Sequence, residues 1–286
     1  MTLFGNTAVV GFGRMGGGIA QVIAQSGRNV TVLESDSGRV DAGFAAVREF
    51  LDAGIARGKV TEARRDEVLG RIRGTTAVEE LADAELVIEA ATERRDVKRA
   101  IFADVAAVVS PNSVVVTNTS ALSVSDLATA IPQPQRFAGL HFFNPAQLMR
   151  VVEIVKGLAT SPEVIDSLVQ FVVEIGKDPV PVKDRPGFLV NRLLMPYLND
   201  AIQELDDELA TAEDIDVAIR LGLGYKLGPF ELLDLIGLDV HEHATRSAYD
   251  ATLDAAFAPP PLLQAMVAAG KLGNKSGGGF REAVQS

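Results

Sequence analysis

Short apolar runs alternate with segments of helical spacing up to about residue 183. Thr7–Val10 and residues 29–33 are short and rich in valine, which predicts buried strands. Residues 18–24, which lie between them, have apolar positions at helical spacing. Similar apolar runs recur at residues 85–90, 113–117, 137–143, 151–155 and 180–182, and a helix is expected at about 94–109. Strands that alternate with helices predict a parallel sheet covered by helices.

Residues 39–73 form a different kind of segment. Their periodicity predicts two helices, at about 39–56 and 61–69, with Thr61 as the N-cap of the second. The segment contains eight Lys or Arg and six Asp or Glu, so it is net positive by two in a chain whose net charge is −11. Two interpretations stay open. The segment is a solvated helical hairpin inserted in the sheet domain, or it is a lid that meets a phosphorylated substrate tail.

Strand patterns stop near Pro186, and helical periodicity continues to the end of the chain. Residues 188–205 carry a broad apolar stripe at three- and four-residue spacing, and Pro196 should kink this helix or follow a break in it. Further helices are expected from Thr211, at 230–250 and at 262–269. We therefore predict a sheet domain, residues 1–185, and an all-helical domain, residues 186–286. The stripe would build a second core, a dimer interface or both.

Composition excludes several classes of function. Of the 286 residues, 47% are hydrophobic and 23% are charged, as in ordinary globular proteins. A net charge of −11 and a pI near 4.8 argue against a general binder of nucleic acid or of anionic membranes. A phosphorylated small ligand needs only a local basic pocket and stays compatible with this charge. The lack of cysteine excludes disulfides, thiolate catalysis and cysteine-bound metals, and no metal site is predicted.

The N-terminal segment and the apolar runs bear on location. No apolar run approaches the roughly 20 residues that a membrane helix needs. The first predicted strand begins within about six residues of the N-terminus. We therefore expect no signal or transit peptide, no membrane partner and a cytoplasmic location.

A glycine-rich turn joins the first predicted strand to the first predicted helix. It reads Gly11-Phe12-Gly13-Arg14-Met15-Gly16. Gly11 permits a tight turn, Gly13 lets the backbone approach a pyrophosphate, and Gly16 lets the helix pack close to the strand. The N–H groups at the start of the helix would then face the phosphates. This order predicts a Rossmann-type doubly wound α/β domain that binds a dinucleotide; a glycine-rich turn in another α/β fold is the alternative.

Glu34 indicates which dinucleotide to expect. It closes the second predicted strand, 18 residues after Gly16. Its carboxylate can accept hydrogen bonds from the ribose hydroxyls, and its charge should repel a 2′-phosphate, so NAD is favoured over NADP. Arg28 and Arg39 lie nearby in sequence and keep NADP open as the alternative.

Two residues on later predicted strands are candidates for proton transfer. His141 lies near the end of one apolar run, and Glu153 is the single glutamate of the next, twelve residues on. A histidine that is aligned by a carboxylate is suited to moving a proton near neutral pH. The plain alternative is a half-buried histidine with a satisfied hydrogen bond.

Polar residues at two other strand ends are candidates for ligand contacts, because such loops face the cofactor in a doubly wound sheet. Asn118, Thr119 and Ser120 could bind a substrate oxygen or the nicotinamide ribose, or form an ordinary turn and helix cap. Glu93 and Lys98 are candidates for the cofactor side, with a surface pair five residues apart as the alternative.

Several segments together resemble the short-chain L-3-hydroxyacyl-CoA dehydrogenase family, which includes the bacterial 3-hydroxybutyryl-CoA dehydrogenases. The resemblance covers essentially the whole chain. Its most specific elements are His-Phe-Phe-Asn-Pro at residues 141–145 and Pro-Gly-Phe-x-x-Asn-Arg at residues 186–192. The other matching segments are residues 11–20, 89–93, 118–120, 228–234 and 273–277.

The resemblance implies reversible, NAD-dependent oxidation of an (S)-3-hydroxyacyl-CoA, with 3-hydroxybutyryl-CoA as the favoured substrate. His141 would be the general base and Glu153 its orienting carboxylate, while Ser120 and Asn191 would position the substrate. A homodimer through the helical domain is also implied. The remaining implied contacts are cofactor contacts from the glycine-rich turn, Glu34, Glu93, Lys98, Ser120, Asn144 and Lys275, and a CoA contact near Arg57.

The chain departs from the family pattern at three places. Phe50 stands where the family often has a serine near CoA, the tail at residues 279–282 lacks the usual aromatic pair, and the loop at residues 222–228 is less typical. Members of the same superfamily also oxidise dicarboxylic 3-hydroxyacyl-CoA thioesters or free hydroxy acids such as L-gulonate, and the resemblance leaves these as alternative substrates. A nucleotide-binding structural protein without turnover would need neither His141 nor Glu153.

Overall fold

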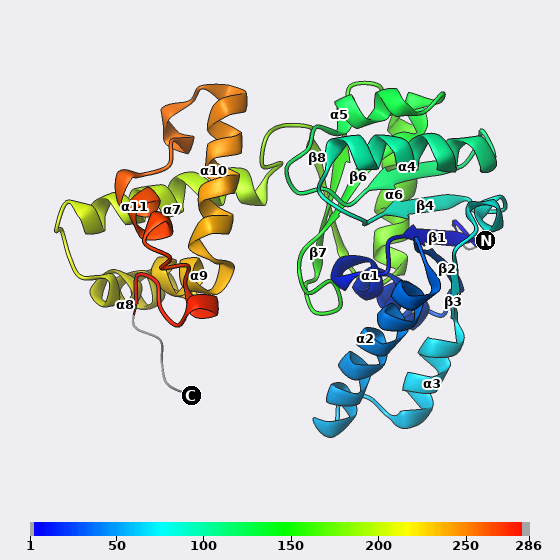
Figure 1. The fold of residues 1–286 in the computed structure, drawn as a ribbon, viewed down its shortest axis with the longest axis horizontal. Helices are drawn as coiled ribbons and strands as arrows, with labels where there is room; N and C mark the ends of the chain where they lie inside the picture. The colour runs from blue at the N-terminus through cyan, green and yellow to red at the C-terminus, as the bar shows by residue number, and fades with distance from the viewer. Residues whose placement is uncertain (1–2, 282–286) are drawn as a thin grey trace. The chain divides into compact units, whose positions relative to one another are not determined.

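The computed structural model describes residues 3–281, so Glu282 and the rest of the predicted tail lie outside the described residues. The chain divides into two compact units, Met1–Arg185 and Pro186–Ser286. The first unit is a sheet with helices, and the described part of the second is helical (Figure 1). The predicted fold class, an α/β sheet domain followed by an all-helical domain, is confirmed.

One sheet of eight strands runs through the described part of the first unit, in the order β3-β2-β1-β4-β5-β6-β7-β8. Among these strands, β6 and β7 pair antiparallel and every other neighbouring pair is parallel. The bounds are β1 Thr7–Val10, β2 Val30–Leu33, β3 Ile72–Thr75, β4 Leu86–Glu89, β5 Val114–Thr117, β6 Phe137–Phe142, β7 Val151–Lys156 and β8 Asp178–Lys183. The winding direction reverses between β1 and β4, and ligands of such sheets bind at the carboxyl ends of the strands beside that point.

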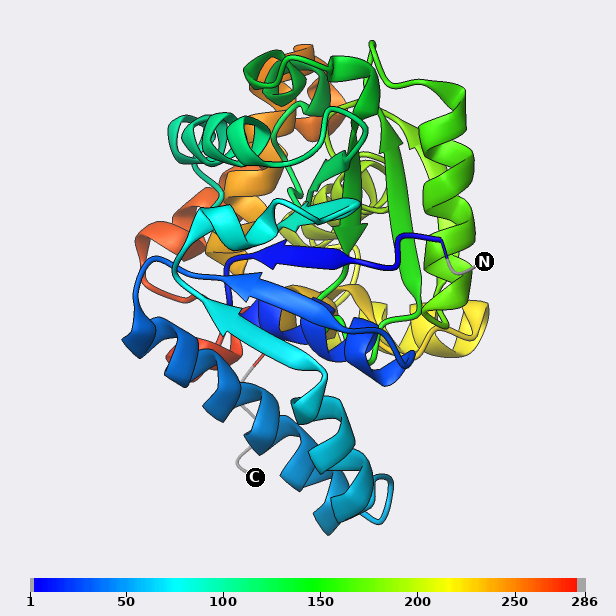
Figure 2. The ribbon, with the colours of Figure 1, turned by 90° about the vertical axis from the view of Figure 1, so that its right-hand side faces the viewer.

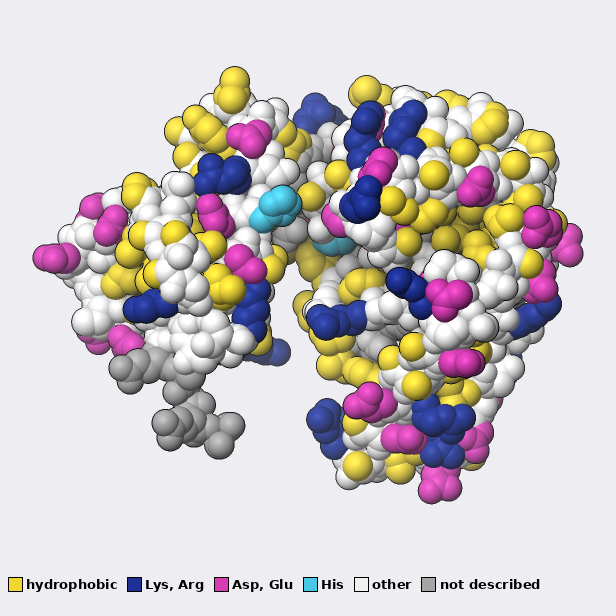
Figure 3. Space-filling model, viewed as in Figure 1, with side chains coloured by type: hydrophobic (Ala, Val, Ile, Leu, Met, Phe, Trp, Pro, Cys, Tyr) yellow, Lys and Arg dark blue, Asp and Glu magenta, His cyan; other side chains and the backbone are white. Residues whose placement is uncertain are grey.

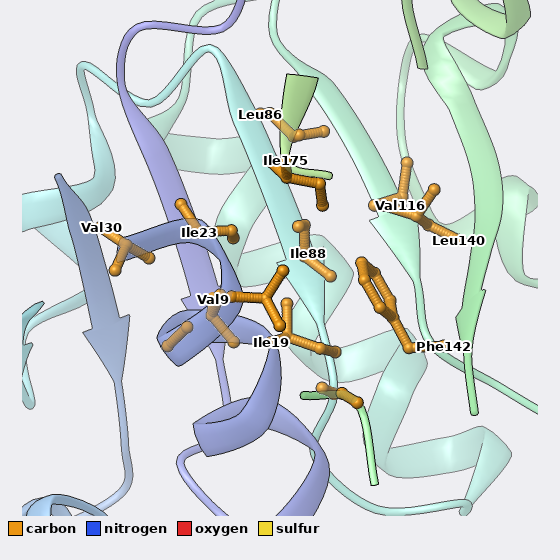
Figure 4. Close-up of a cluster of buried hydrophobic side chains, with 14 of the residues drawn as sticks. Val9, Ile19, Ile23, Val30, Leu86, Ile88, Val116, Leu140, Phe142 and Ile175 are labelled. Atoms are coloured by element: carbon orange, nitrogen blue, oxygen red, sulfur yellow. The ribbon is translucent and has the colours of Figure 1, made fainter. Parts of the chain in front are cut away.

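Helices cover both faces of the sheet (Figure 2). On one face, α1 (Arg14–Gln25) and α6 (Pro162–Glu174) contribute apolar side chains to a single core with the strands. Ile19 and Ile23 of α1 lie beside Val9 in this core (Figure 4). The other face carries α4 (Arg95–Val108) and the short α5 (Val124–Leu127). The central strands β1, β4, β5 and β6 are buried along their whole length, which holds their carboxyl ends at fixed positions.

The basic hairpin consists of α2 (Ser37–Ala56) and α3 (Glu62–Gly70). The Thr61 hydroxyl accepts a hydrogen bond from the backbone N–H of Arg64, so the predicted N-cap is confirmed. The two helices lie close to the bounds predicted for them, but residues 72 and 73 of the predicted hairpin segment belong to β3 instead. The hairpin is therefore the crossover between the parallel strands β2 and β3 rather than an insertion. Basic and acidic side chains are mixed over its surface (Figure 3).

The second unit contains α7 (Val190–Asp206), α8 (Ala212–Leu223), α9 (Pro229–Ile236), α10 (Leu238–Thr252) and α11 (Pro261–Ala268). Helix α7 continues through Pro196, so the break considered for this position is absent from the described helix. The Thr211 hydroxyl caps α8. The single helix expected at 230–250 was wrong: Gly237 adopts φ +102° and separates α9 from α10. That backbone conformation suits glycine and ends a helix.

A buried polar network holds α7, α10 and the connection after α10 together. His241 Nε2 lies 3.0 Å from the side-chain oxygen of Asn199, whose amide nitrogen donates to the Thr245 hydroxyl and to the Ala256 carbonyl. His241 is buried, and burial lowers its pKa from 6.5 to about 4. The folded protein therefore keeps this imidazole neutral at pH values where an unfolded chain would protonate it.

Acid is therefore expected to destabilise the protein through His241. Between pH 6.5 and pH 4 the unfolded chain binds a proton that the folded state excludes, so stability is complete above this window and falls within it. The expected loss of unfolding free energy is about 3 kcal/mol. Urea unfolding followed by circular dichroism should show this pH dependence in the wild type and much less of it in His241→Gln. The exposed neighbour His243 supplies the control, and equal pH dependence in His241→Gln and His243→Gln would contradict the expectation.

Every helix in residues 3–281 is too short or too polar to cross a membrane. The same residues contain no group of three or more His, Cys, Asp or Glu side chains that could hold a metal ion.

Candidate active site

A cavity of about 700 Å³ lies at the carboxyl ends of β1, β2 and β4. Its volume falls in the range that holds small ligands and cofactors. The wall includes the glycine-rich turn, the end of β2 and the loop after β4. Its lining residues include Val10, Gly11, Gly13, Leu33, Glu34, Ser35, Arg39, Ala90, Ala91, Thr92, Val97 and Ile101. This is the crevice in which a doubly wound sheet binds a dinucleotide.

The three glycines of the turn have different surroundings. Gly11 adopts φ +98°, and a Cβ there would lie 2.9 Å from the Ala90 carbonyl oxygen. A Cβ at Gly16 would lie 1.8 Å from the Gly11 carbonyl oxygen, so this glycine mainly admits the turn itself and only secondarily the strand at Val9. At Gly13, by contrast, the added carbon would meet no described residue within 4 Å apart from its own chain neighbours. Gly13 therefore presents open backbone to the cavity, as close approach of a pyrophosphate requires.

Glu34 is held at the cavity wall by backbone donors. Its two carboxylate oxygens accept hydrogen bonds from the N–H groups of Phe12, at 2.8 Å, and Ser35, at 2.9 Å. Each oxygen keeps acceptor capacity for a ribose hydroxyl. Arg39 also lines the cavity, whereas Arg28 pairs with Glu174 and stacks on Phe171. Arg28 is thereby engaged away from the wall, which weakens one of the two arguments for NADP.

His141 and Glu153 stand directly opposite each other on the antiparallel strands β6 and β7. His141 Nδ1 lies 2.7 Å from Glu153 Oε2, and both side chains are buried. Because a carboxylate only accepts hydrogen bonds, Nδ1 carries the hydrogen in the neutral ring and Nε2 carries the lone pair. The pair has the geometry of a general base with an orienting carboxylate.

The loop after β5 is held between β4 and β6. Glu93 Oε1 accepts hydrogen bonds from the Thr119 hydroxyl at 2.6 Å and from the Ser120 N–H at 2.9 Å, and the Ser120 hydroxyl lies 3.3 Å away. The Asn118 side-chain oxygen accepts from the Phe142 N–H, next to His141. The structure therefore brings Glu93, Ser120 and His141 to the same edge of the sheet.

Lys98 is not part of a surface pair, because its side chain is buried and that alternative was wrong. Its ammonium lies 2.8 and 2.7 Å from the two oxygens of Glu89, and 3.6 Å from Glu93 Oε2. Glu89 was not selected from the sequence. A glutamate that ends a buried strand, nine positions before a lysine on the following helix, was the available signal.

Comparison with known families matches both units. Residues 6–185 match the family model described as "3-hydroxyacyl-CoA dehydrogenase, NAD binding domain". Residues 187–283 match "3-hydroxyacyl-CoA dehydrogenase, C-terminal domain". The chain belongs to the 3-hydroxyacyl-CoA dehydrogenase family. It is an NAD-dependent oxidoreductase that acts on a 3-hydroxyacyl-CoA, and the open backbone at Gly13 and the backbone-held Glu34 fit the NAD that this family binds.

Relatives of this dehydrogenase differ in the acyl group that their names contain. A 3-hydroxyadipyl-CoA dehydrogenase from Escherichia coli is 42% identical over 97% of this chain, but the match spans only 60% of that protein. A 3-hydroxybutyryl-CoA dehydrogenase from Mycobacterium tuberculosis is 43% identical over 95% of this chain and 96% of its own length. The crystal structure of (S)-3-hydroxybutyryl-CoA dehydrogenase from Ralstonia eutropha superimposes with a TM-score of 0.95 at 38% identity, covering 99% of this chain and 100% of that one.

The remaining predicted site residues of the dehydrogenase are exposed or lie in the second unit. Asn144 is exposed and precedes Pro145 through a cis peptide bond, and Arg57 is exposed at the end of α2. Asn191 is half-buried in the first turn of α7. Lys275 forms an ion pair with Asp239, at 2.5 and 2.7 Å. The local geometry of these residues is compatible with the roles predicted for them.

Proposed function

We propose that this dehydrogenase interconverts (S)-3-hydroxybutyryl-CoA and acetoacetyl-CoA, with His141 and Glu153 as its proton-transfer pair. The hydrogen bond between His141 Nδ1 and Glu153 Oε2 is the observation that carries the chemistry. The acyl length rests on the relatives named 3-hydroxybutyryl-CoA dehydrogenase, which match along almost their full length.

In the oxidation direction, the lone pair of His141 Nε2 takes the proton of the 3-hydroxyl. Glu153 holds the ring in the required tautomer and stabilises the imidazolium that forms, as an acceptor fixed at Nδ1 must. Bound NAD supplies the acceptor for the hydride that leaves C3. In the reduction direction, the imidazolium returns the proton to the new alkoxide. A positioned base of this kind contributes about 10²–10⁴-fold in rate.

Other residues are proposed to bind and orient. Ser120, which Glu93 holds at the end of β5, positions the substrate oxygen. Asn191 keeps the substrate-positioning role that the family resemblance implies. Glu34 accepts hydrogen bonds from the adenosine ribose hydroxyls, and the glycine-rich turn binds the pyrophosphate. The rest of the proposed set consists of Glu93, Lys98, Asn144 and Lys275 at the nicotinamide half of NAD, and Arg57 toward CoA.

A dicarboxylic substrate is the second candidate, because the Escherichia coli relative at 42% identity is named for 3-hydroxyadipyl-CoA. The two substrates differ at the far end of the acyl chain, where adipyl carries a carboxylate. The half-buried Phe50 and the mixed charges of the hairpin, which includes the Arg65–Asp52 ion pair, do not separate them.

A kinetic panel tests the substrate. NADH oxidation should be measured with acetoacetyl-CoA, longer 3-ketoacyl-CoAs, 3-ketoadipyl-CoA and free acetoacetate, and then repeated with NADPH. We expect the highest kcat/KM with acetoacetyl-CoA and NADH, and little turnover of the free acid. A preference for 3-ketoadipyl-CoA would establish the dicarboxylic substrate instead. Turnover of acetoacetate equal to that of acetoacetyl-CoA would show that the enzyme does not recognise CoA.

We also propose that the enzyme forms a homodimer through its helical unit. Large apolar side chains are exposed on helices of that unit, among them Leu193 of α7, Leu221 of α8 and Leu235 of α9. Where such side chains form one patch, they are typical of an interface. We further propose that the enzyme is cytoplasmic, as the sequence favours.

A further inference from the structure

We propose that Glu89 is a positioning residue of this dehydrogenase. It holds Lys98, and through Lys98 it sets the place of Glu93 and of the loop that carries Ser120. The inference rests on the proposed role of Ser120 at the cofactor and substrate. Glu89 itself would touch neither NAD nor the acyl group.

The Glu89 carboxylate is fully buried at the end of β4. Among the described residues it accepts hydrogen bonds from the Ala91 N–H at 2.8 Å, from the Thr117 hydroxyl at 2.8 Å and, with both oxygens, from the Lys98 ammonium. A buried carboxylate is tolerated only where it is paired and hydrogen-bonded in this way. The hydrogen bond from Ala91 also fixes the loop after β4. Ala90 and Ala91 of this loop line the cavity.

Lys98 stands between two carboxylates of different character. It contacts Glu89 at 2.7 and 2.8 Å inside the protein and lies 3.6 Å from Glu93, whose side chain is 41% exposed. The ammonium therefore pairs mainly with the buried carboxylate of Glu89. Glu93 Oε1 is then available to accept hydrogen bonds from the Thr119 hydroxyl and the Ser120 N–H.

Neutralising Glu89 should change the carboxylate with which Lys98 pairs. With a glutamine at this position, Glu93 becomes the nearest carboxylate to the Lys98 ammonium. Attraction between unlike charges at this separation, in a partly buried setting, favours a direct pair. Glu93 would then turn toward Lys98 and release the donors of the loop at Ser120. The loop would lose the position from which it meets cofactor and substrate.

The competing explanation is an ordinary buried ion pair that contributes only to folding. Breaking one partner of a buried pair is strongly destabilising, whereas replacing both partners is often nearly neutral. The two explanations therefore differ in the folded single variant. If the pair serves folding alone, folded Glu89→Gln binds NADH and turns over like the wild type. If Glu89 positions the loop, folded Glu89→Gln loses NADH affinity and kcat as well as stability.

The test compares the wild type with Glu89→Gln. Thermal midpoint, Kd for NADH and kcat with acetoacetyl-CoA are measured for each. Arg28→Met is the matched control, because it breaks a buried ion pair of the same unit away from the cavity wall. It should lower the thermal midpoint and leave Kd for NADH unchanged.

We expect Glu89→Gln to lower the thermal midpoint, to weaken NADH binding and to lower kcat by about 10- to 100-fold, the cost of misplaced positioning groups. Wild-type NADH affinity and kcat in folded Glu89→Gln would overturn the inference, because stability alone would then have changed, as expected for Arg28→Met. If Glu89→Gln does not fold, Thr117→Val, which removes one hydrogen-bond donor to the same carboxylate, is measured in its place. Wild-type NADH affinity in Thr117→Val would then overturn the inference. If the wild type turns over no 3-ketoacyl-CoA, the proposed function fails, while Kd for NADH still tests the role of Glu89.

Discussion

Replacing His141 by glutamine is expected to lower kcat for NADH oxidation with acetoacetyl-CoA by about 10²–10⁴-fold. Glutamine cannot take up or release a proton at the position of Nε2, so no general acid or base acts on the substrate oxygen. The amide can still donate a hydrogen bond to Glu153, so the buried carboxylate at this site keeps a partner and the strand pair β6–β7 should fold normally.

Steady-state kinetics, NADH titration and thermal unfolding of the same preparation check this expectation. His141→Gln should bind NADH with wild-type affinity and unfold close to the wild-type temperature. His243→Gln, at an exposed position of the second unit, should retain full turnover. A kcat near that of the wild type would remove His141 from the proton-transfer step.

The second large effect is expected at Gly16. A Cβ at this position would lie 1.8 Å from the Gly11 carbonyl oxygen, a backbone atom that cannot rotate away. Gly16→Ala must therefore displace the glycine-rich turn. We expect a loss of about 3 kcal/mol of unfolding free energy, at the upper end of overpacking effects, together with loss of NADH binding, because the same turn lines the cavity.

Gly13→Ala is the matched comparison. The φ of −73° at Gly13 suits alanine, and the added carbon would meet no described residue within 4 Å apart from its own chain neighbours. It should fold like the wild type and yet bind NADH more weakly, because the methyl group occupies space in the cavity. Chemical denaturation and NADH titration of both variants separate the two effects. Equal stability of Gly16→Ala and the wild type would contradict the role assigned to Gly16.

Much of the sheet could be predicted from the sequence because its strands are local and apolar. Runs such as Thr7–Val10 contain valines that are buried on both faces, and the chain pattern around them alternates with helical spacing. The cavity wall was predictable for the same reason, since Gly11, Gly13 and Glu34 follow from one strand, turn and helix in succession.

The errors arose where apolar spacing carries no signal. β3 has the sequence Ile-Arg-Gly-Thr, which carries little apolar signal, and it forms a strand because β2 offers a parallel edge. The break at Gly237 depends on a positive φ that spacing does not reveal. Neither a strand edge supplied by a distant segment nor a positive φ at a single glycine leaves a mark in the apolar spacing.

The candidate site divides in the same way. A partnership between His141 and Glu153 could be predicted as a hypothesis, but only the antiparallel register places the two side chains opposite each other. The burial of Lys98 against Glu89 joins a strand end to a helix and lies beyond any local pattern. The roles of Asn144, Asn191, Lys275 and Arg57, and the dimer, stay predictions.

A double-mutant cycle tests most directly whether His141 and Glu153 act as one unit. The four proteins are the wild type, Glu153→Gln, His141→Gln and the double variant, compared by kcat with acetoacetyl-CoA and NADH. Residues that act together in one step show strongly non-additive losses. The account predicts that Glu153→Gln lowers kcat in the wild type and causes no further loss once His141 is replaced. Losses that multiply in the double variant would contradict it.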